Sequence, residues 1–161
     1  MPPNGYEKTV QLSVLDRLVD TEPEVRSEAP ITRSESLRRL RQSVKRDLEW
    51  LLNTSRIADE FPEAYVELRN SLWVYGIPDI ASVTLNSAQD EQRLLRGIEE
   101  AISNFEPRLA RVRVVCFDRI TKKRAAIEFH IEAVLLVDPA PERIAFDTVL
   151  EMAKGSYTVK D

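Results

Sequence analysis

One stretch of the chain, residues 94–117, changes its hydrophobic period abruptly at a proline. Before the proline, apolar residues recur every three or four positions, which is the spacing of one buried helix face. After it, apolar and polar residues alternate, as in a strand with one buried face. Pro107 disfavours helical geometry at Glu106, so the helix is predicted to end at residues 104–105. The sequence therefore predicts a helix that enters a strand through a rigid corner, which exposes Glu106 and Arg108.

The strand predicted after this corner has two distinct faces. Val112, Val114 and Cys116 point to one side, and Arg111 and Arg113 point to the other. Three further strands are predicted at 125–137, 144–150 and 157–160, and a basic loop at 118–124 joins the first two strands as a hairpin. On pairing, the two arginines face the same side as Glu128 and Glu132, where such pairs favour one register.

A second long helix is predicted from Thr32 onward. Thr32-Arg33-Ser34-Glu35 has the form of a capping box, as does Ser87-Ala88-Gln89-Asp90 before the other helix. Asn53-Thr54-Ser55 ends the second helix, because short polar side chains compete for backbone hydrogen bonds. The order of helices followed by hairpin strands indicates an α+β fold, with two main helices packed on one face of a largely antiparallel sheet. The apolar positions of the second helix are Leu37, Leu40, Val44, Leu48 and Leu51.

The remaining segments have weaker signals. Residues 1–30 are predicted to be a flexible arm that carries a short docking helix at 11–20, and residues 31–161 a single domain. Residues 56–86 are predicted to be irregular, with Trp73 and Tyr75 covering the core. Gly76 within them permits a turn with positive φ.

Length, charge and cysteine content limit the class of protein. The chain has 161 residues, a net charge of −4 and one cysteine. This length is sufficient for a core without a disulfide or metal, and a single thiol is typical of a reducing compartment. The negative charge argues against a general nucleic-acid-binding protein. No N-terminal export signal and no apolar run of about 18 residues is recognised, so neither export by that route nor a membrane span is expected.

Few residues could support catalysis. His130 is the only histidine, and its spacing from Glu128 and Glu132 is also typical of a solvated strand face, so no metal site is predicted. Cys116 is interpreted as a small core residue. No glycine-rich phosphate-binding motif occurs, and no carboxylate lies in an apolar setting that would raise its pKa for proton donation. We therefore expect no catalytic residue, no cofactor and no small-molecule substrate.

Several segments together resemble one family, the short baseplate-wedge protein of contractile injection machines, in the form found in bacterial type VI secretion systems. This family is related to the small "lysozyme-like" wedge protein of contractile phage tails. The segments occur in the family's order and span most of the chain. They are LSVLDRLVD (12–20), SVKRDLEWLLNT (43–54), SLWVYGIPDI (71–80), IEEAISNFEPRL (98–109) and IEFHIEAVLL (127–136).

The resemblance implies a structural protein rather than an enzyme. It implies a cytoplasmic location in a baseplate docked at the inner membrane, where six wedges surround a hub and each subunit binds the other wedge subunits and the contractile sheath. It also implies a fold similar to the interlocking (handshake) domain of the sheath subunit. The family's Glu-Pro-Arg signature, which is implicated in gripping the core bundle of the wedge, matches residues 106–108. The partner-binding residues that the resemblance suggests are Glu106, Pro107, Arg108, Asn53, Thr54, Tyr75 and Gly76.

The sheath contact that the resemblance implies is the addition of a sheath strand to a free sheet edge. The edge is predicted to lie at 143–150 and 156–160, with Phe146, Thr148, Tyr157 and Val159 as candidates. Two other classes stay open. One is a peptidoglycan hydrolase that acts through paired carboxylates. The other is a regulatory or nucleic-acid adaptor built on the basic face of the helix after Thr32, a face that is otherwise solvated charge or a docking surface for an acidic partner.

Overall fold

The computed structural model describes residues 9–19, 23–24, 31–57, 65–77, 88–118, 126–151 and 155–160. The loop predicted at 118–124 lies outside these residues except for its first position, and so do Ser87 of the predicted capping box and parts of the irregular segment 56–86. The chain divides into two compact units, residues 1–44 and 45–161, and the long helix α2 (Arg33–Leu52) contributes residues to both.

The first unit contains the short helix α1 (Val14–Leu18) and the beginning of α2. The hydroxyl of Ser13 accepts a hydrogen bond from the amide of Asp16 and caps α1, while the Asp16 carboxylate accepts one from Ser43 at 2.6 Å. At the start of α2, the Thr32 hydroxyl accepts the Glu35 amide at 3.3 Å, as the capping signal predicts. α1 is shorter than the predicted helix 11–20, and none of its residues is buried.

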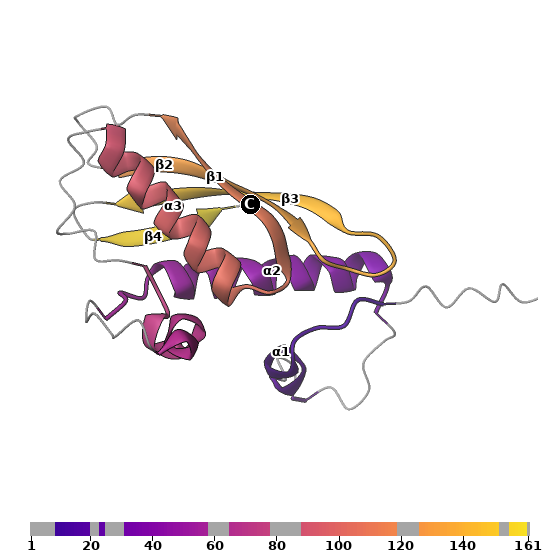
Figure 1. Ribbon diagram of the computed structural model, residues 1–161. Coiled ribbons are helices and arrows are strands. Elements are labelled where there is room, and N and C mark those ends of the chain that lie inside the picture. The colour runs from indigo at the N-terminus through magenta and orange to yellow at the C-terminus, as the bar shows by residue number, and fades with distance from the viewer. Residues whose placement is uncertain are drawn as a thin grey trace, which may run out of the picture. The chain divides into compact units, whose positions relative to one another are not determined.

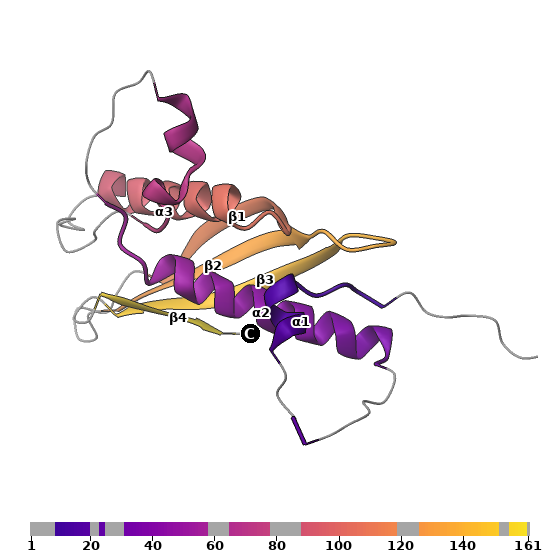
Figure 2. The ribbon, with the colours of Figure 1, turned by 90° about the horizontal axis from the view of Figure 1, so that it is seen from below.

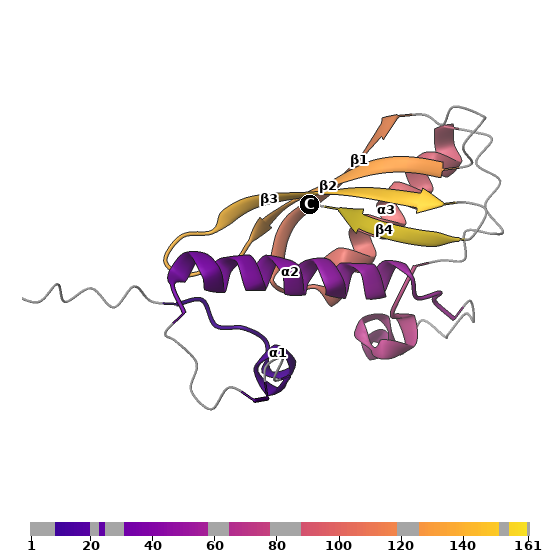
Figure 3. The ribbon, with the colours of Figure 1, turned by 180° about the vertical axis from the view of Figure 1, so that it is seen from behind.

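The second unit is a four-stranded antiparallel sheet with helices packed against it, so the predicted α+β class is confirmed. Its strands are β1 (Leu109–Asp118), β2 (Ala126–Leu135), β3 (Glu142–Glu151) and β4 (Ser156–Lys160), arranged side by side in that order (Figure 3). Helix α3 (Ala88–Phe105) lies against β1 on one face of the sheet (Figure 1).

Burial alternates along the strands, and this places one face of the sheet in the core. On β2, for example, residues 127, 129, 131, 133 and 135 are buried. The predicted inward positions of β1, β3 and β4 follow the same rule, although Val112 and Cys116 are only half-buried. The largest fully buried side chains of this unit are Leu48, Leu52, Ile98, Ile102, Phe129, Ile131, Leu135, Leu150, Thr148 and Val159.

Strand β1 departs from the regular pairing that its alternation predicts. Ala110 lies opposite Val134, but Arg113 lies opposite Glu132, so β1 contains one extra residue between these pairs. This is a β-bulge, and Arg111 within it has a positive φ of 54°. The periodicity of the sequence does not reveal the bulge.

The segment between α2 and α3 contains two 3₁₀ turns, η1 (Val66–Asn70) and η2 (Leu72–Val74). Tyr75 contacts the core-flanking ring of Phe105 edge-on, with ring centroids 5.1 Å apart. Trp73, however, is 45% exposed. The prediction that both aromatic residues cover the core therefore fits Tyr75 better than Trp73, which is covered only in part.

Candidate functional site

The Glu-Pro-Arg corner connects α3 to β1 within three residues. The Glu106 amide donates to the Ile102 carbonyl at 2.9 Å, which completes the last turn of the helix. The Leu109 amide donates to the Glu106 carbonyl at 3.0 Å, and the Leu136 amide to the Arg108 carbonyl at 2.8 Å. Helix α3 ends at Phe105, as the proline predicts. The corner is therefore tied to both the helix and the sheet.

Glu106 and Arg108 are bound to each other. The Arg108 guanidinium donates to both carboxylate oxygens of Glu106, at 2.6 Å from Nε and 2.5 Å from Nη2. The Arg108 amide donates to the same carboxylate at 3.2 Å. Glu106 is 4% exposed, so the prediction that the corner exposes both charges is wrong for Glu106. A charge this deeply buried is tolerated because it is paired and hydrogen-bonded.

Asp47 of α2 is the third member of this group, and sequence reasoning missed it. Arg108 Nη2 donates to Asp47 Oδ2 at 2.5 Å, and the other Asp47 oxygen accepts from Arg46 at 2.8 Å. Burial alone would lower the pKa of Arg108, but its hydrogen bonds to Glu106 and Asp47 outweigh burial and raise that pKa. We call Glu106, Arg108 and Asp47 the corner cluster. Sixty-one positions separate Asp47 from Arg108, and no local pattern links them.

Tyr75 lies close enough to the corner cluster to sense its charges. The pKa of the Tyr75 phenol is raised, mainly by burial and further by the negative charges of Asp47 and Glu106. The structure therefore brings together three of the residues that the resemblance suggests, namely Glu106, Arg108 and Tyr75. Pro107 between the two charged residues is exposed.

Asn53, Thr54 and Gly76 gather at the end of α2. The Thr54 carbonyl accepts the amide of Ile77 at 2.9 Å, and the Ile77 carbonyl accepts the amide of Arg56 at 2.8 Å. Gly76 has the predicted positive φ, at 104°, and a Cβ at this position would lie 2.2 Å from the Thr54 carbonyl oxygen. Thr54 and Gly76 therefore hold the loop against the helix end.

The outer edge of β4 is occupied by side chains from the same region of α2. Asn53 Nδ2 donates to the Tyr157 carbonyl at 2.9 Å, and Asn53 Oδ1 accepts the Tyr157 amide at 2.8 Å. The Glu49 carboxylate accepts the Val159 amide at 3.0 Å. Figure 2 shows the end of α2 beside β4. β4 therefore lies at the margin of the sheet as predicted, but the predicted free edge at Tyr157 and Val159 is wrong.

The other predicted edge strand, β3, lies inside the sheet. Thr148 pairs with Phe129 of β2 and with Val159 of β4, so its predicted place at an edge is wrong. Phe146 pairs with β2, and β4 pairs only with Asp147–Glu151 of β3. All four candidate side chains are buried, with exposed fractions of 1–3%. Within β3, only the backbone of residues 142–146 therefore has a side without a strand partner among the described residues.

At the opposite margin, the Glu99 carboxylate of α3 accepts the Val114 amide of β1 at 2.8 Å. Both margins of the sheet thus have a strand amide bonded to a glutamate from a neighbouring helix. His130 Nδ1 lies 2.5 Å from Asp147 Oδ1, and among the described residues no three His, Cys, Asp or Glu side chains come together as metal ligands would. In the same part of the chain, no helix is long and apolar enough to cross a membrane.

Comparison with known proteins identifies the class of this fold. The profile of the baseplate wedge protein gp25 family matches residues 38–140, which include the end of α2, the corner and the first two strands. The chain therefore belongs to the baseplate wedge protein gp25 family. Among solved structures it is similar to a chain of "The baseplate complex from the type VI secretion system", with 16% identity and a TM-score of 0.49, over 77% of this chain and 96% of that chain. No curated protein matches the sequence.

Proposed function

We propose that the protein is a structural wedge subunit of a type VI secretion baseplate, which binds the other wedge subunits and templates polymerisation of the contractile sheath. The observation that carries the proposal is the family match over residues 38–140. The five sequence segments from 12 to 136 favour the type VI form of the family over the phage form. The protein acts by assembly rather than catalysis, in the baseplate at the inner membrane.

The sequence suggests that both charged residues of the corner contact a partner, whereas the structure leaves only Arg108 and Pro107 accessible for this function. Glu106 and Asp47 occupy the inner side of the Arg108 guanidinium, so they position it rather than bind a partner. Arg108 keeps 23% of its side chain exposed, and Pro107 beside it is exposed. A partner helix therefore meets a proline-fixed backbone and one pre-oriented cation. Such a rigid surface loses little conformational entropy on binding.

The buried carboxylate argues for assembly over peptidoglycan hydrolysis. Glu106 is the only buried acid in the described part of the chain, and both of its oxygens accept hydrogen bonds from Arg108. A general acid for glycoside cleavage must hold a proton to donate, and a second carboxylate must face it across the substrate. Both Glu106 oxygens are instead engaged by the Arg108 guanidinium, an arrangement that suits a structural ion pair.

For sheath templating, β3 offers a suitable place. Since the edge of β4 at Tyr157 and Val159 is occupied, a sheath strand would add beside residues 142–146 of β3, in line with β4. Main-chain hydrogen bonds would supply the affinity of this strand addition.

Co-purification with the other wedge subunits of the same secretion system tests the proposal. We expect the tagged wild-type chain to retain them through size-exclusion chromatography, and failure to do so would overturn the wedge assignment. Pro107→Glu should weaken this association about tenfold, because it places a third carboxylate beside Arg108. Pro141→Glu, at an exposed proline between β2 and β3, is the matched control. Equal association of both variants would refute contact at the corner.

A further inference from the structure

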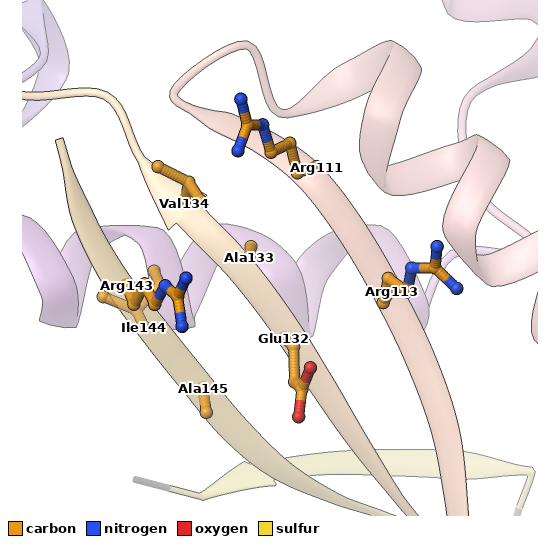
Figure 4. A pocket seen from close by; sticks show the side chains of 8 residues that line it. All are labelled: Arg111, Arg113, Glu132, Ala133, Val134, Arg143, Ile144 and Ala145. Atoms are coloured by element: carbon orange, nitrogen blue, oxygen red, sulfur yellow. The ribbon is translucent and has the colours of Figure 1, made fainter.

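The open face of the sheet contains a concave pocket of about 530 Å³. It lies over the first half of β3, the end of β2 and the bulge of β1 (Figure 4). This basic pocket is lined by Arg111, Arg113, Glu132, Ala133, Val134, Arg143, Ile144 and Ala145. It belongs neither to the corner cluster nor to the occupied margins of the sheet.

The pocket carries a local excess of positive charge. Its lining includes three arginines, Arg111, Arg113 and Arg143, and a single carboxylate, that of Glu132 (Figure 4). Within the described part of the chain, none of these arginines forms an ion pair or a side-chain hydrogen bond. The chain as a whole has a net charge of −4, so this concentration of unpaired cations opposes the general charge of the protein. Unpaired guanidinium groups at the wall of a cavity attract anions.

The bulge in β1 creates this arrangement. Regular pairing from Ala110 onward would place Val112 opposite Glu132, but the extra residue places Arg113 there instead. Arg111 lines the pocket from the bulge itself, with a left-handed backbone that a residue other than glycine rarely adopts. Such a conformation is strained and persists where the surrounding structure requires it. The strained backbone therefore belongs to one of the three arginines that line the basic pocket.

The neighbouring backbone suits an extended occupant. Tyr157 turns its amide and carbonyl away from β3, so Ser156, Thr158 and Lys160 pair with the odd-numbered residues of β3. Arg143 and Ala145 consequently direct their backbone groups to the side that β4 leaves unpaired. These two residues also line the pocket. An extended segment bound beside Arg143 and Ala145 could therefore pair with both the backbone of β3 and the guanidinium groups of the pocket.

We propose that the basic pocket binds an extended acidic segment of a protein partner, with Asp or Glu side chains paired to Arg111, Arg113 and Arg143. Arginine binds carboxylates through two parallel hydrogen bonds, which gives the site specificity as well as charge. The apolar walls at Val134 and Ala145 suit the stems of such side chains. Nucleic acid fits less well, because no aromatic residue lines the pocket to stack on bases and Glu132 would repel phosphates. The site adjoins the position proposed for the sheath strand at Arg143 and Ala145, but the arginines that carry it do not depend on that proposal.

Binding of a short fluorescein-labelled oligoglutamate peptide to the full-length chain, followed by fluorescence anisotropy, tests this inference. The double variant Arg111→Gln/Arg143→Gln should weaken binding about tenfold or more, and Glu132→Gln should strengthen it. The control Arg93→Gln/Arg96→Gln removes the same charge from the exposed face of α3 and should bind as the wild type.

Three results would overturn the inference. They are no binding by the wild type, equal weakening by both double variants, or tighter binding of a single-stranded oligonucleotide through the same arginines. All four arginines are exposed, so we expect the variants to stay folded, and circular dichroism checks this. Co-purification with wedge subunits is independent of this assay. If the chain fails to bind the peptide but still co-purifies with wedge subunits, only the acidic-segment site is refuted. If it binds the peptide but does not co-purify, only the wedge assignment is refuted.

Discussion

Asn53 and Tyr157 are joined by two hydrogen bonds, one in each direction, although 104 residues separate them. The side-chain amide of Asn53 presents to β4 the donor and acceptor that a neighbouring strand would present. Glu49, one helical turn earlier, accepts the Val159 amide in the same way. A free strand edge is a site for indiscriminate pairing, and these two side chains of α2 protect it.

Replacement of Asn53 by alanine should therefore destabilise the second unit. The change leaves the Tyr157 amide and carbonyl without partners, and we expect a loss of about 1–2 kcal/mol, since each hydrogen bond contributes about 1 kcal/mol. Urea unfolding monitored by circular dichroism measures the loss. Gln92→Ala removes an exposed amide from α3 and should change stability by less than about 0.5 kcal/mol. Equal effects of the two changes would contradict a protective role for Asn53.

For the corner cluster, the structure and the sequence predict opposite effects of Arg108→Ala on folding stability. From the sequence, Arg108→Ala is expected to leave folding intact, because both charges of the corner are predicted to be exposed. In the structure, the change leaves the buried Glu106 carboxylate unpaired and beside Asp47. We expect a loss of about 3 kcal/mol, at the lower end of the range for a broken buried pair because Arg108 is partly exposed.

A second variant distinguishes loss of charge pairing from loss of packing. Arg108→Met combined with Glu106→Gln removes both charges of the pair, and it should cost less than Arg108→Ala alone. Chemical denaturation of the set measures the difference. An Arg108→Ala variant that is no less stable than Arg93→Ala, at a residue with 80% of its side chain exposed, would refute the argument.

The sequence predicts the elements of this fold well because each has a local cause. The change of period at Pro107 fixes the end of α3, and the alternation after it fixes the faces of β1. The features it does not predict are non-local. The outer edge of β4 is hydrogen-bonded by Asn53 and Glu49. In the sequence these two residues indicate only the end of a helix and an exposed helical acid. The ion pairing of the corner includes Asp47, which binds Arg108 from α2, 61 positions away along the chain.

Tyr157 combines a buried phenol with a satisfied backbone. In the described structure its hydroxyl has no hydrogen-bond partner, and burial raises the pKa of the phenol above its usual value of 10.0. Tyr157→Phe keeps the edge-on contact with the Phe129 ring at 5.9 Å and removes the unsatisfied group. We therefore expect stability to increase by about 1 kcal/mol.

The pH dependence of Tyr157 follows from the same burial. The folded protein holds the phenolic proton more tightly than the unfolded chain does. The free energy of unfolding that this proton contributes is therefore complete below pH 10.0 and decreases as pH rises above it. Tyr157→Phe should reduce the alkaline loss of stability in thermal melts between neutral and alkaline pH. Tyr65→Phe, at a side chain 59% exposed, should leave that loss unchanged. A wild-type melting temperature as insensitive to alkaline pH as that of Tyr157→Phe would contradict the burial effect.

Gly76 and Gly155 provide a matched pair of backbone substitutions. Both have positive φ, at 104° and 61°, but a Cβ at Gly76 meets the Thr54 carbonyl whereas one at Gly155 meets nothing within 4 Å. Gly155→Ala should cost about 1 kcal/mol, the usual penalty of a left-handed alanine. Gly76→Ala adds a clash and should cost about 3 kcal/mol. Differential scanning fluorimetry compares them, and similar melting temperatures would mean that the loop at Gly76 can move away from α2.

Ala145→Pro separates strand addition at β3 from the folding of the sheet. The Ala145 amide points to the side that β4 leaves unpaired, so proline there removes no hydrogen bond to β2, and its ring blocks an incoming strand. We expect a modest loss of stability, retained co-purification with wedge subunits, and a loss of at least about tenfold in sheath nucleation measured by electron microscopy of assembled tubes. Thr158→Pro, which removes an amide that pairs with β3, should instead destabilise the sheet. Normal sheath assembly by a folded Ala145→Pro variant would show that the sheath attaches elsewhere.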